Sequence, residues 1–109
     1  MNARVTYVQA PAEKIDEGLA LWRKNVLPVT MGREGFMGVI SLINRQTGKC
    51  VSLTIWDVEK NLLASTEAEY HQQAVERYKE YFGGAHEPEN YEISFVGGPL
   101  FKSAAGVDR

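Results

Sequence analysis

Cysteine is almost absent from this sequence, since Cys50 is the only one among 109 residues. A single cysteine cannot form an internal disulfide, and it cannot supply the thiolate ligands of a typical structural zinc site. The two histidines, His71 and His86, do not have the spacing of a metal-binding pair. The sequence therefore predicts no metal centre. Cys50 falls in the middle of a predicted strand, where a lone cysteine usually acts as a small buried apolar residue.

Clusters of positive charge are missing too. The 12 Lys and Arg residues are scattered, no basic run is longer than Arg23-Lys24, and the formal net charge is −2. Surfaces that bind nucleic acid or an anionic membrane carry clustered Lys and Arg, so we expect neither partner. No apolar stretch approaches the roughly 20 residues that span a bilayer. The N-terminus lacks the apolar segment of a signal peptide, and we therefore expect a cytoplasmic protein.

The first third of the chain predicts a strand followed by an amphipathic helix. Residues 4–9 alternate and are rich in β-branched and aromatic side chains, which favours a strand. Pro11 suits the first turn of the helix that follows. An apolar stripe then runs from Ile15 to Val29 at spacings of three and four residues. Pro28 is expected to kink or tighten the last turn, and Gly32 to end the helix.

The most informative region runs from Gly35 to Phe82. Two apolar strands, 36–45 and 49–56, flank a turn at Gln46-Thr47-Gly48-Lys49, and a long helix is predicted over 59–82. A last strand is expected over 91–96. The order β-α-β-β-α-β predicts an α+β, ferredoxin-like fold, with an antiparallel sheet and two helices on one of its faces.

The hairpin is apolar on both faces. The pattern places Phe36, Gly38, Ile40 and Leu42 on one face, and Met37, Val39 and Ile43 on the other. Two helices cover only one face of a sheet this small, so the second face predicts a partner. The simplest partner is a second copy of the chain, giving a homodimer through the open sheet face. We expect one domain over residues 1–96 and a C-terminal tail over 97–109, either flexible or packed on the partner subunit.

The chain resembles the antibiotic biosynthesis monooxygenase family of the dimeric α/β barrel superfamily. The resemblance covers about residues 3–96 and is carried by Gly35-Phe36, the turn at Arg45-Gln46-Thr47-Gly48, Trp56-Asp57 and Glu69-Tyr70. It implies a sheet-to-sheet dimer with one apolar pocket per subunit, between the sheet and its helices. The superfamily includes cofactor-free monooxygenases, haem-degrading enzymes, isomerases, polyketide cyclases and proteins without known activity, so the resemblance specifies the fold better than the reaction.

The resemblance and the chemistry of individual residues together give a set of candidate site residues. Trp56 matches a tryptophan that lines the pocket in cofactor-free oxygenases of aromatic polyketides. Those enzymes have an asparagine four residues earlier and a tyrosine six residues later, where this chain has Ser52 and Leu62. His71 and Ser52 are the candidate catalytic residues, because histidine titrates near neutral pH and can exchange protons with a phenol. The candidate substrate-binding residues are Trp56, Tyr70, Trp22 and Arg23.

Three functions stay open on this basis. The first is a cofactor-independent monooxygenase or related small enzyme that acts on an aromatic or quinol-like compound. The second is a small-molecule carrier or sensor with the same pocket, and the third is a structural dimer with a filled core. A haem-degrading oxygenase matches less well, because the predicted second helix has no tryptophan and the strand predicted over residues 4–9 offers Thr6 and Gln9 rather than an asparagine. We expect no cofactor.

Overall fold

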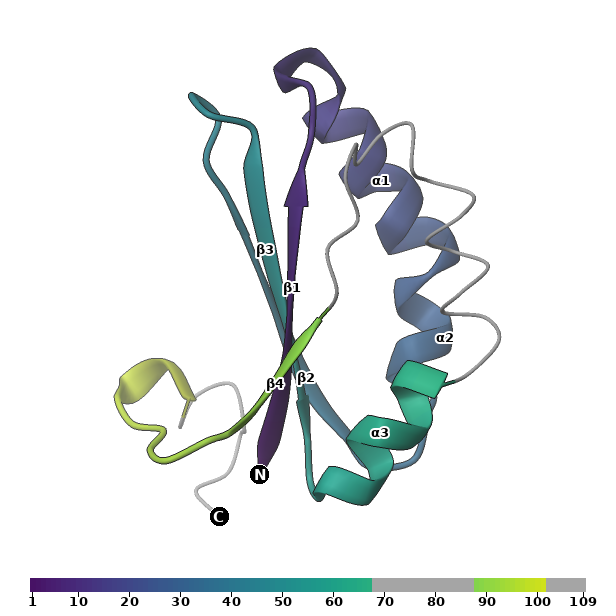
Figure 1. Cartoon of the computed structure of the whole chain (residues 1–109), viewed down its shortest axis with the longest axis vertical. Helices are drawn as coiled ribbons and strands as arrows, with labels where there is room; N and C mark the ends of the chain where they lie inside the picture. Colours follow the sequence, from purple (N-terminus) through teal and green to yellow (C-terminus); the bar gives the residue numbers. More distant parts are fainter. Residues whose placement is uncertain (68–87, 102–109) are drawn as a thin grey trace.

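Four strands form a single antiparallel sheet in this computed structural model, which describes residues 1–67 and 88–101. The strands are β1 (Asn2–Gln9), β2 (Phe36–Ile43), β3 (Lys49–Trp56) and β4 (Glu89–Glu92), in the order β2-β3-β1-β4. A short 3₁₀ turn, η1 (Ala12–Lys14), precedes the helices α1 (Ile15–Asn25), α2 (Leu27–Met31) and α3 (Glu59–Glu67). This is the predicted ferredoxin-like arrangement (Figure 1).

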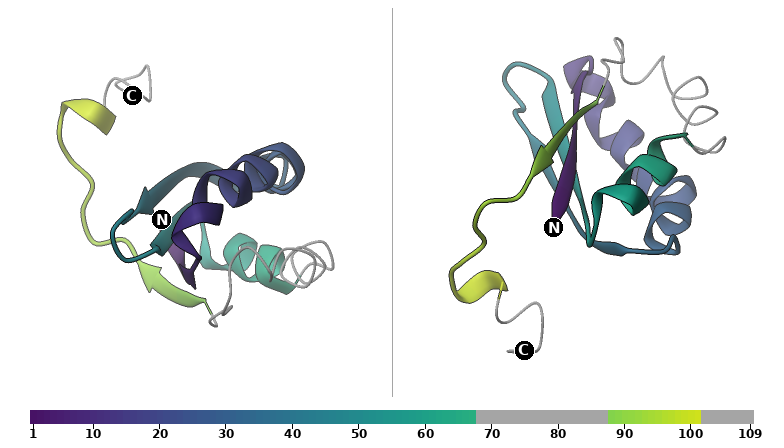
Figure 2. Two further views of the ribbon diagram at one scale, coloured as in Figure 1. Left: turned by 90° about the horizontal axis from the view of Figure 1, so that it is seen from above. Right: turned by 60° about the horizontal axis from the view of Figure 1, so that its bottom comes forward.

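The helices form one layer and the sheet forms the other. Helix α2 packs against β2, and α3 packs against β1 and β3. The views in Figures 1 and 2 place all three helices on the same side of the sheet. After β4 the chain runs away from the domain on the opposite side, so the face without helices is bordered by this C-terminal segment (Figure 2).

Pro28 divides the predicted first helix into two. Helix α1 ends at Asn25, and Pro28 lies in the first turn of α2, where its missing N–H is tolerated. Gly32 ends α2, as predicted. The apolar stripe does not continue through the break: Val29 is 47% exposed, and Thr30 is buried in its place. Val26, the residue between the two helices, has φ of −106° and ψ of −48°, so the regular helix is interrupted there and the buried position shifts by one residue.

A β-bulge at Met37 corrects the predicted faces of the hairpin. Phe36 pairs with Trp56, whereas Gly38 pairs with Ile55, so Met37 is the extra residue. Simple alternation places Phe36 on the same face as Ile40 and Leu42. This prediction is wrong, because the bulge puts Phe36 on the face of Trp56. The ring centroids of Phe36 and Trp56 lie 5.6 Å apart in an edge-to-face arrangement.

The predicted second helix and last strand are confirmed only where the structure describes them. Helix α3 starts at Glu59 as expected, and the rest of the predicted helix, with Tyr70 and His71, lies outside the described residues. Strand β4 ends at Glu92 rather than Val96, although Ile93 N–H still donates to the carbonyl of Met1 at 2.9 Å. Beyond Ile93 the chain passes the end of β1 and pairs with no strand in residues 1–67 and 88–101.

Candidate functional site

The hydrogen bond between Arg4 of β1 and Ser65 of α3 identifies the face of the sheet that the helices cover. Residues paired across an antiparallel sheet point to the same side, and so do alternate residues along a strand. Arg4 pairs with Thr54, Thr6 with Ser52, and Ser52 with Ser41. We call the set that includes Arg4 the helix-covered face; it consists of Asn2, Arg4, Thr6, Val8, Phe36, Val39, Ser41, Ile43, Cys50, Ser52, Thr54, Trp56, Asn90 and Glu92.

One end of the helix-covered face is a closed core around Trp56. Trp56 and Leu62 have no exposed surface, and the indole Nε1–H donates to Thr54 Oγ1 at 3.0 Å. The Phe36 ring closes another side of the indole. The resemblance predicts that Trp56 lines the pocket and binds the substrate. In this arrangement the indole has no exposed surface that a ligand could contact. Substrate binding by Trp56 therefore stays a prediction, and it requires the indole to move out of the core.

The residues that carry the family resemblance fix the start of α3. Asp57 accepts at Oδ1 from the Val58 backbone N–H at 2.6 Å and from Asn61 Nδ2 at 2.9 Å. The hydrogen bond from Asn61 holds the pKa of Asp57 below its usual value. Asp57 N–H in turn donates to the carbonyl of Gly35 at 2.9 Å. Gly35 has φ of 86°, and a side chain there would meet Asp57 and Asn61.

A buried guanidinium lies next to this core. Arg4 is only 4% exposed, and its Nη1 donates to Ser65 Oγ at 2.8 Å. Ser65 is fully buried, and its hydroxyl donates to the carbonyl of Leu62 at 2.8 Å. Because the hydroxyl proton is directed to that carbonyl, the oxygen lone pairs are available to Arg4, and both side chains are held in place. A charged arginine this deeply enclosed is uncommon.

Beside the buried guanidinium, three hydroxyl side chains form a row across the sheet. Thr6, Ser52 and Ser41 are direct neighbours on β1, β3 and β2. We call these three residues the hydroxyl row. Thr6 and Ser52 are half-buried and Ser41 is exposed, in contrast to the fully enclosed surroundings of Trp56. The row therefore keeps surface that a small molecule can contact, and its hydroxyls both donate and accept hydrogen bonds.

The other predicted site residues are spread out. Ser52 lies in the hydroxyl row, and Trp22 is half-buried on α1. Arg23 is exposed and lies near enough to Asp16 to lower its pKa, although Arg45 has the larger effect through two hydrogen bonds of 2.9 and 3.1 Å to that carboxylate. Tyr70 and His71 lie outside the described residues. Sequence reasoning missed Arg4, whose only signal was a basic residue between the apolar Ala3 and Val5.

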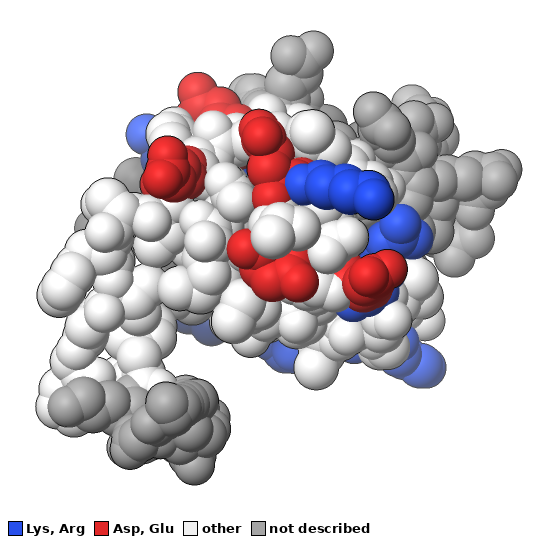
Figure 3. Space-filling model, turned by 90° about the horizontal axis from the view of Figure 1, so that it is seen from below, with Lys and Arg blue, Asp and Glu red and all other residues white. Residues whose placement is uncertain are grey.

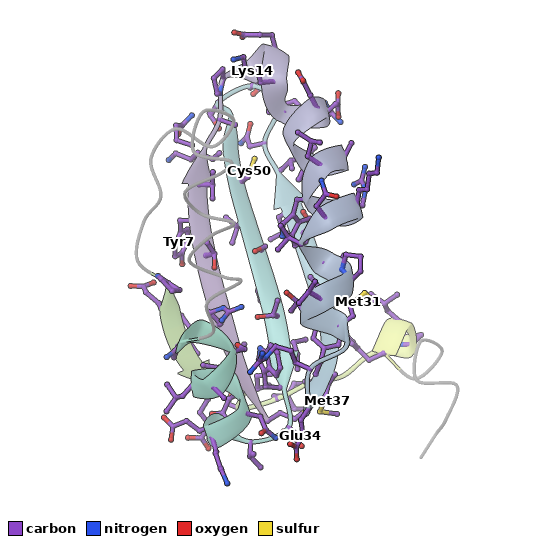
Figure 4. All side chains as sticks on the ribbon, turned by 90° about the vertical axis from the view of Figure 1, so that its right-hand side faces the viewer. Tyr7, Lys14, Met31, Glu34, Met37 and Cys50 are labelled. Carbon is purple, nitrogen blue, oxygen red and sulfur yellow. The ribbon has the colours of Figure 1, made fainter. Side chains whose placement is uncertain are left out.

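Cys50 is the small buried residue that the sequence predicted, at 7% exposed. Its Sγ approaches the carbonyl of Gly48 at 3.7 Å, and burial raises the pKa of its thiol, which keeps it protonated and unreactive at neutral pH. Figure 4 places it at the end of β3 nearest Lys14, and Met37 toward the opposite end of the hairpin. The hydroxyl row occupies the register positions between these two ends of the sheet.

Charge on the described surface is mixed. Figure 3 shows acidic and basic side chains interspersed on the face seen from below. In residues 1–67 and 88–101, no group of three His, Cys, Asp or Glu side chains is placed to hold a metal ion. A search of the same described ranges finds no helix with the length and apolar character needed to cross a membrane.

The face without helices is largely apolar. We call it the open face; it includes Ala3, Val5, Tyr7, Ile40, Leu42, Val51, Leu53, Ile55 and Tyr91. Leu42 is 52% exposed and Tyr91 is 48% exposed. The Tyr91 hydroxyl donates to Glu89 at 2.7 Å, and this hydrogen bond is the main reason that the pKa of Tyr91 rises to about 12.

Comparison with known sequences gives relatives without an assigned activity. The chain is 37% identical over 92 residues to the uncharacterized proteins Rv2557 and MT2634, from two strains of Mycobacterium tuberculosis. The match covers 84% of this chain and 40% of each relative, so the matched segment spans about two fifths of their length. No profile of a known protein family matches the chain.

Comparison with solved structures shows the fold clearly. A putative antibiotic biosynthesis monooxygenase from Nitrosomonas europaea aligns with a TM-score of 0.70 and 14% identity, covering 87% of this chain and all of the other. One from Deinococcus radiodurans has a TM-score of 0.69 and 16% identity, over 90% and 97% of the two chains. SnoaB, a cofactor-independent oxygenase from Streptomyces nogalater, has a TM-score of 0.71 and 9% identity, over 87% and 94%. These neighbours support the resemblance that the sequence indicated, and the chain has their ferredoxin-like fold.

Proposed function

We propose that this chain is a cofactor-independent monooxygenase, or a related small enzyme, acting on an aromatic, quinol-like compound at the hydroxyl row. The observation that carries the proposal is the accessible polar strip of Thr6, Ser52 and Ser41 on the helix-covered face, in a fold shared with a cofactor-independent oxygenase. Ligand sites are typically apolar surfaces with a few convergent polar groups.

The proposed chemistry draws its electrons from the substrate. A phenol that takes up one O₂ and releases one water becomes a quinone. One oxygen atom joins the ring, and the other leaves as water with two hydrogens from the substrate, whose ring supplies all four electrons. The protein then has to bind and orient the ring, exclude water and accept a proton. Ser52 orients the substrate oxygen by hydrogen bonding, and His71 remains the predicted proton acceptor.

An oxygen-uptake assay tests this function. Purified protein is mixed with a panel of hydroquinones, naphthols and anthrone-like compounds, and the same panel is screened for thermal stabilisation. We expect at least one compound to stabilise the protein and to be oxidised. Ser52→Ala should then lower kcat/KM roughly fivefold, because one hydrogen bond to the substrate contributes about 1 kcal/mol. Ser94→Ala, at an exposed position after β4, is the matched control and should leave the rate unchanged. If no compound stabilises the protein and no compound causes oxygen uptake, the proposal is refuted.

The complete burial of Trp56 favours a second candidate, a binding protein or structural dimer without catalysis. A binding protein would hold a small molecule at the hydroxyl row without a reaction. In a structural dimer, the protein's own side chains would cover the row. Stabilisation by an aromatic compound without oxygen uptake would support the binding protein. Stabilisation by haemin alone would support the haem-degrading alternative instead.

A homodimer through the open face is part of the proposal. Its support is the exposed apolar surface of that face, together with Phe95 and Leu100, which are 83% and 69% exposed on the C-terminal segment bordering it. A second copy would cover the face and give the segment a surface to pack on. Analytical ultracentrifugation tests this directly, and a monomer at micromolar concentration would contradict it. A cytoplasmic location also belongs to the proposal.

A further inference from the structure

We propose that the open face binds a second copy of the chain in one orientation, which is set by two reciprocal ion pairs between Lys49 of each subunit and Glu89 of the other. This inference rests on the proposed homodimer and adds the contacts that orient it. Neither the resemblance nor the comparisons with known proteins assign a role to Lys49 or Glu89.

Among the side chains that the four strands place on the open face, only Lys49 and Glu89 are charged. Lys49 pairs with Gln9 of β1, and Glu89 pairs with Val5, so both lie on the side of the sheet away from the helices. Both are exposed, and residues 1–67 and 88–101 contain no salt bridge to either of them. An apolar face with one cation and one anion at separate positions is complementary in charge to a second copy of itself.

Tyr91 holds the Glu89 carboxylate in place. Its hydroxyl donates to Glu89 Oε1 at 2.7 Å, which leaves the lone pairs of Oε2 for a cation. The raised pKa of Tyr91 is due mainly to Glu89 and in smaller part to Tyr7, which places two phenol groups beside the carboxylate. The faces of aromatic rings also attract an ammonium group. Because Tyr7 is 41% exposed and Tyr91 is 48% exposed, a lysine from another subunit can reach this cluster.

The sheet register determines where the twofold axis of this dimer lies. A symmetric contact that brings Lys49 onto the partner's Glu89 also brings the partner's Lys49 onto Glu89, and the axis passes midway between the two positions. On β1, Tyr7 lies midway between Gln9 and Val5, the register neighbours of the two charges. Since β1 also lies between β3 and β4 in the sheet, Tyr7 is the residue at the midpoint, and the axis passes next to it.

This arrangement gives the interface an apolar centre and charged edges. Val51 pairs with Tyr7, and Leu53 pairs with Val5, so apolar side chains surround the axis. The two charges lie outside this centre. Many protein interfaces have the same anatomy, in which the apolar centre excludes water and the charges around it select the partner and fix its orientation.

A charge-reversal cycle tests the ion pairs. Lys49→Glu and Glu89→Lys, each alone, bring like charges together and should weaken the dimer at least about tenfold in sedimentation equilibrium. The double variant restores opposite charges, so its dissociation constant should return to within about threefold of the wild-type value. Lys60→Glu, the same charge change at an exposed lysine of α3, is the control and should leave the dimer unchanged.

A crosslinking measurement locates the axis. Tyr7→Cys should be joined into a covalent dimer by a short bis-maleimide, because the two copies of this position face each other. Leu42→Cys, similarly exposed but two strands away on β2, should not be joined. The wild-type protein, whose Cys50 is buried, is the blank. Crosslinking at Leu42→Cys and not at Tyr7→Cys would refute the orientation.

Three outcomes separate the inference from the proposed homodimer. If the wild type is a dimer and the single charge reversals associate as tightly, the ion pairs are refuted and the homodimer stands. If each reversal weakens the dimer and the double variant does not recover, the pairing of Lys49 with Glu89 is refuted. A wild-type protein that is monomeric at micromolar concentration refutes both the inference and the homodimer.

Discussion

Replacing Trp56 is the perturbation whose cost the structure defines best. The side chain is fully buried, contacts Phe36 edge to face and donates to Thr54. Trp56→Ala should therefore lower the free energy of unfolding by about 3–5 kcal/mol, the usual cost of removing a large buried aromatic side chain. The whole free energy of unfolding of a domain of this size is about 5–15 kcal/mol. The variant should therefore melt at least about 12 °C below the wild type or fail to fold.

Milder variants separate the contributions of Trp56. Trp56→Phe keeps a ring against Phe36 but removes the indole N–H, so its cost reports the hydrogen bond to Thr54. Trp56→Leu removes the ring, and together with Phe36→Leu it forms a double-mutant cycle. We expect a coupling energy of about 0.5–1.5 kcal/mol for the ring pair. Trp22→Phe, at the other tryptophan and half-buried, is the matched control with a smaller cost. Denaturant unfolding at one fixed protein concentration measures all of them, since a dimer makes stability concentration-dependent. A cost below about 1 kcal/mol for Trp56→Ala would refute the assignment of Trp56 to the core.

Three further predictions follow from the described geometry. Gly35→Ala should destabilise the protein by at least about 1–2 kcal/mol in denaturant unfolding, because φ is 86° and the new methyl group would meet Asp57 and Asn61; an unchanged midpoint would contradict this. Leu53→Glu on the open face should shift the sedimentation profile from dimer to monomer, whereas Leu53→Ala should leave mostly dimer; an intact dimer with the glutamate would argue against this interface. Tyr91 should titrate at about pH 12 in ultraviolet absorbance, and Glu89→Gln should move it toward the ordinary value of about 10. Since folding raises this pKa, the stabilising contribution is complete below about pH 10 and is lost as pH rises through about 12; titration unaffected by Glu89→Gln would contradict the stated cause.

The element order was predictable because each element has a local signal. The hairpin has alternation and a turn, and Asn44 Oδ1 accepts from the backbone N–H groups of Gln46 and Thr47 at 3.0 and 3.2 Å, while Gly48 takes φ of 81°. The bulge at Met37 has no such signal. It depends on how β2 pairs with β3, which simple alternation does not encode, and the face of Phe36 was wrong for that reason.

The resemblance specified the fold because the residues that carry it are structural. Gly35, Trp56 and Asp57 join the start of β2 to the end of β3 and the start of α3. The candidate site consists instead of common residues, Arg4, Ser52 and Thr6, which become notable only when the sheet register brings them together on one face. Single polar residues in strands do not reveal this from the sequence.

The central claim is that an aromatic substrate binds on the helix-covered face at the hydroxyl row. The most direct test is a crystal structure of the protein with a bound hydroxynaphthoate. We predict that the ring lies over Ser52 and Thr6, with one of its oxygen atoms within hydrogen-bonding distance of the Ser52 hydroxyl. A ligand bound on the open face, or in contact with neither of these residues, would contradict the account.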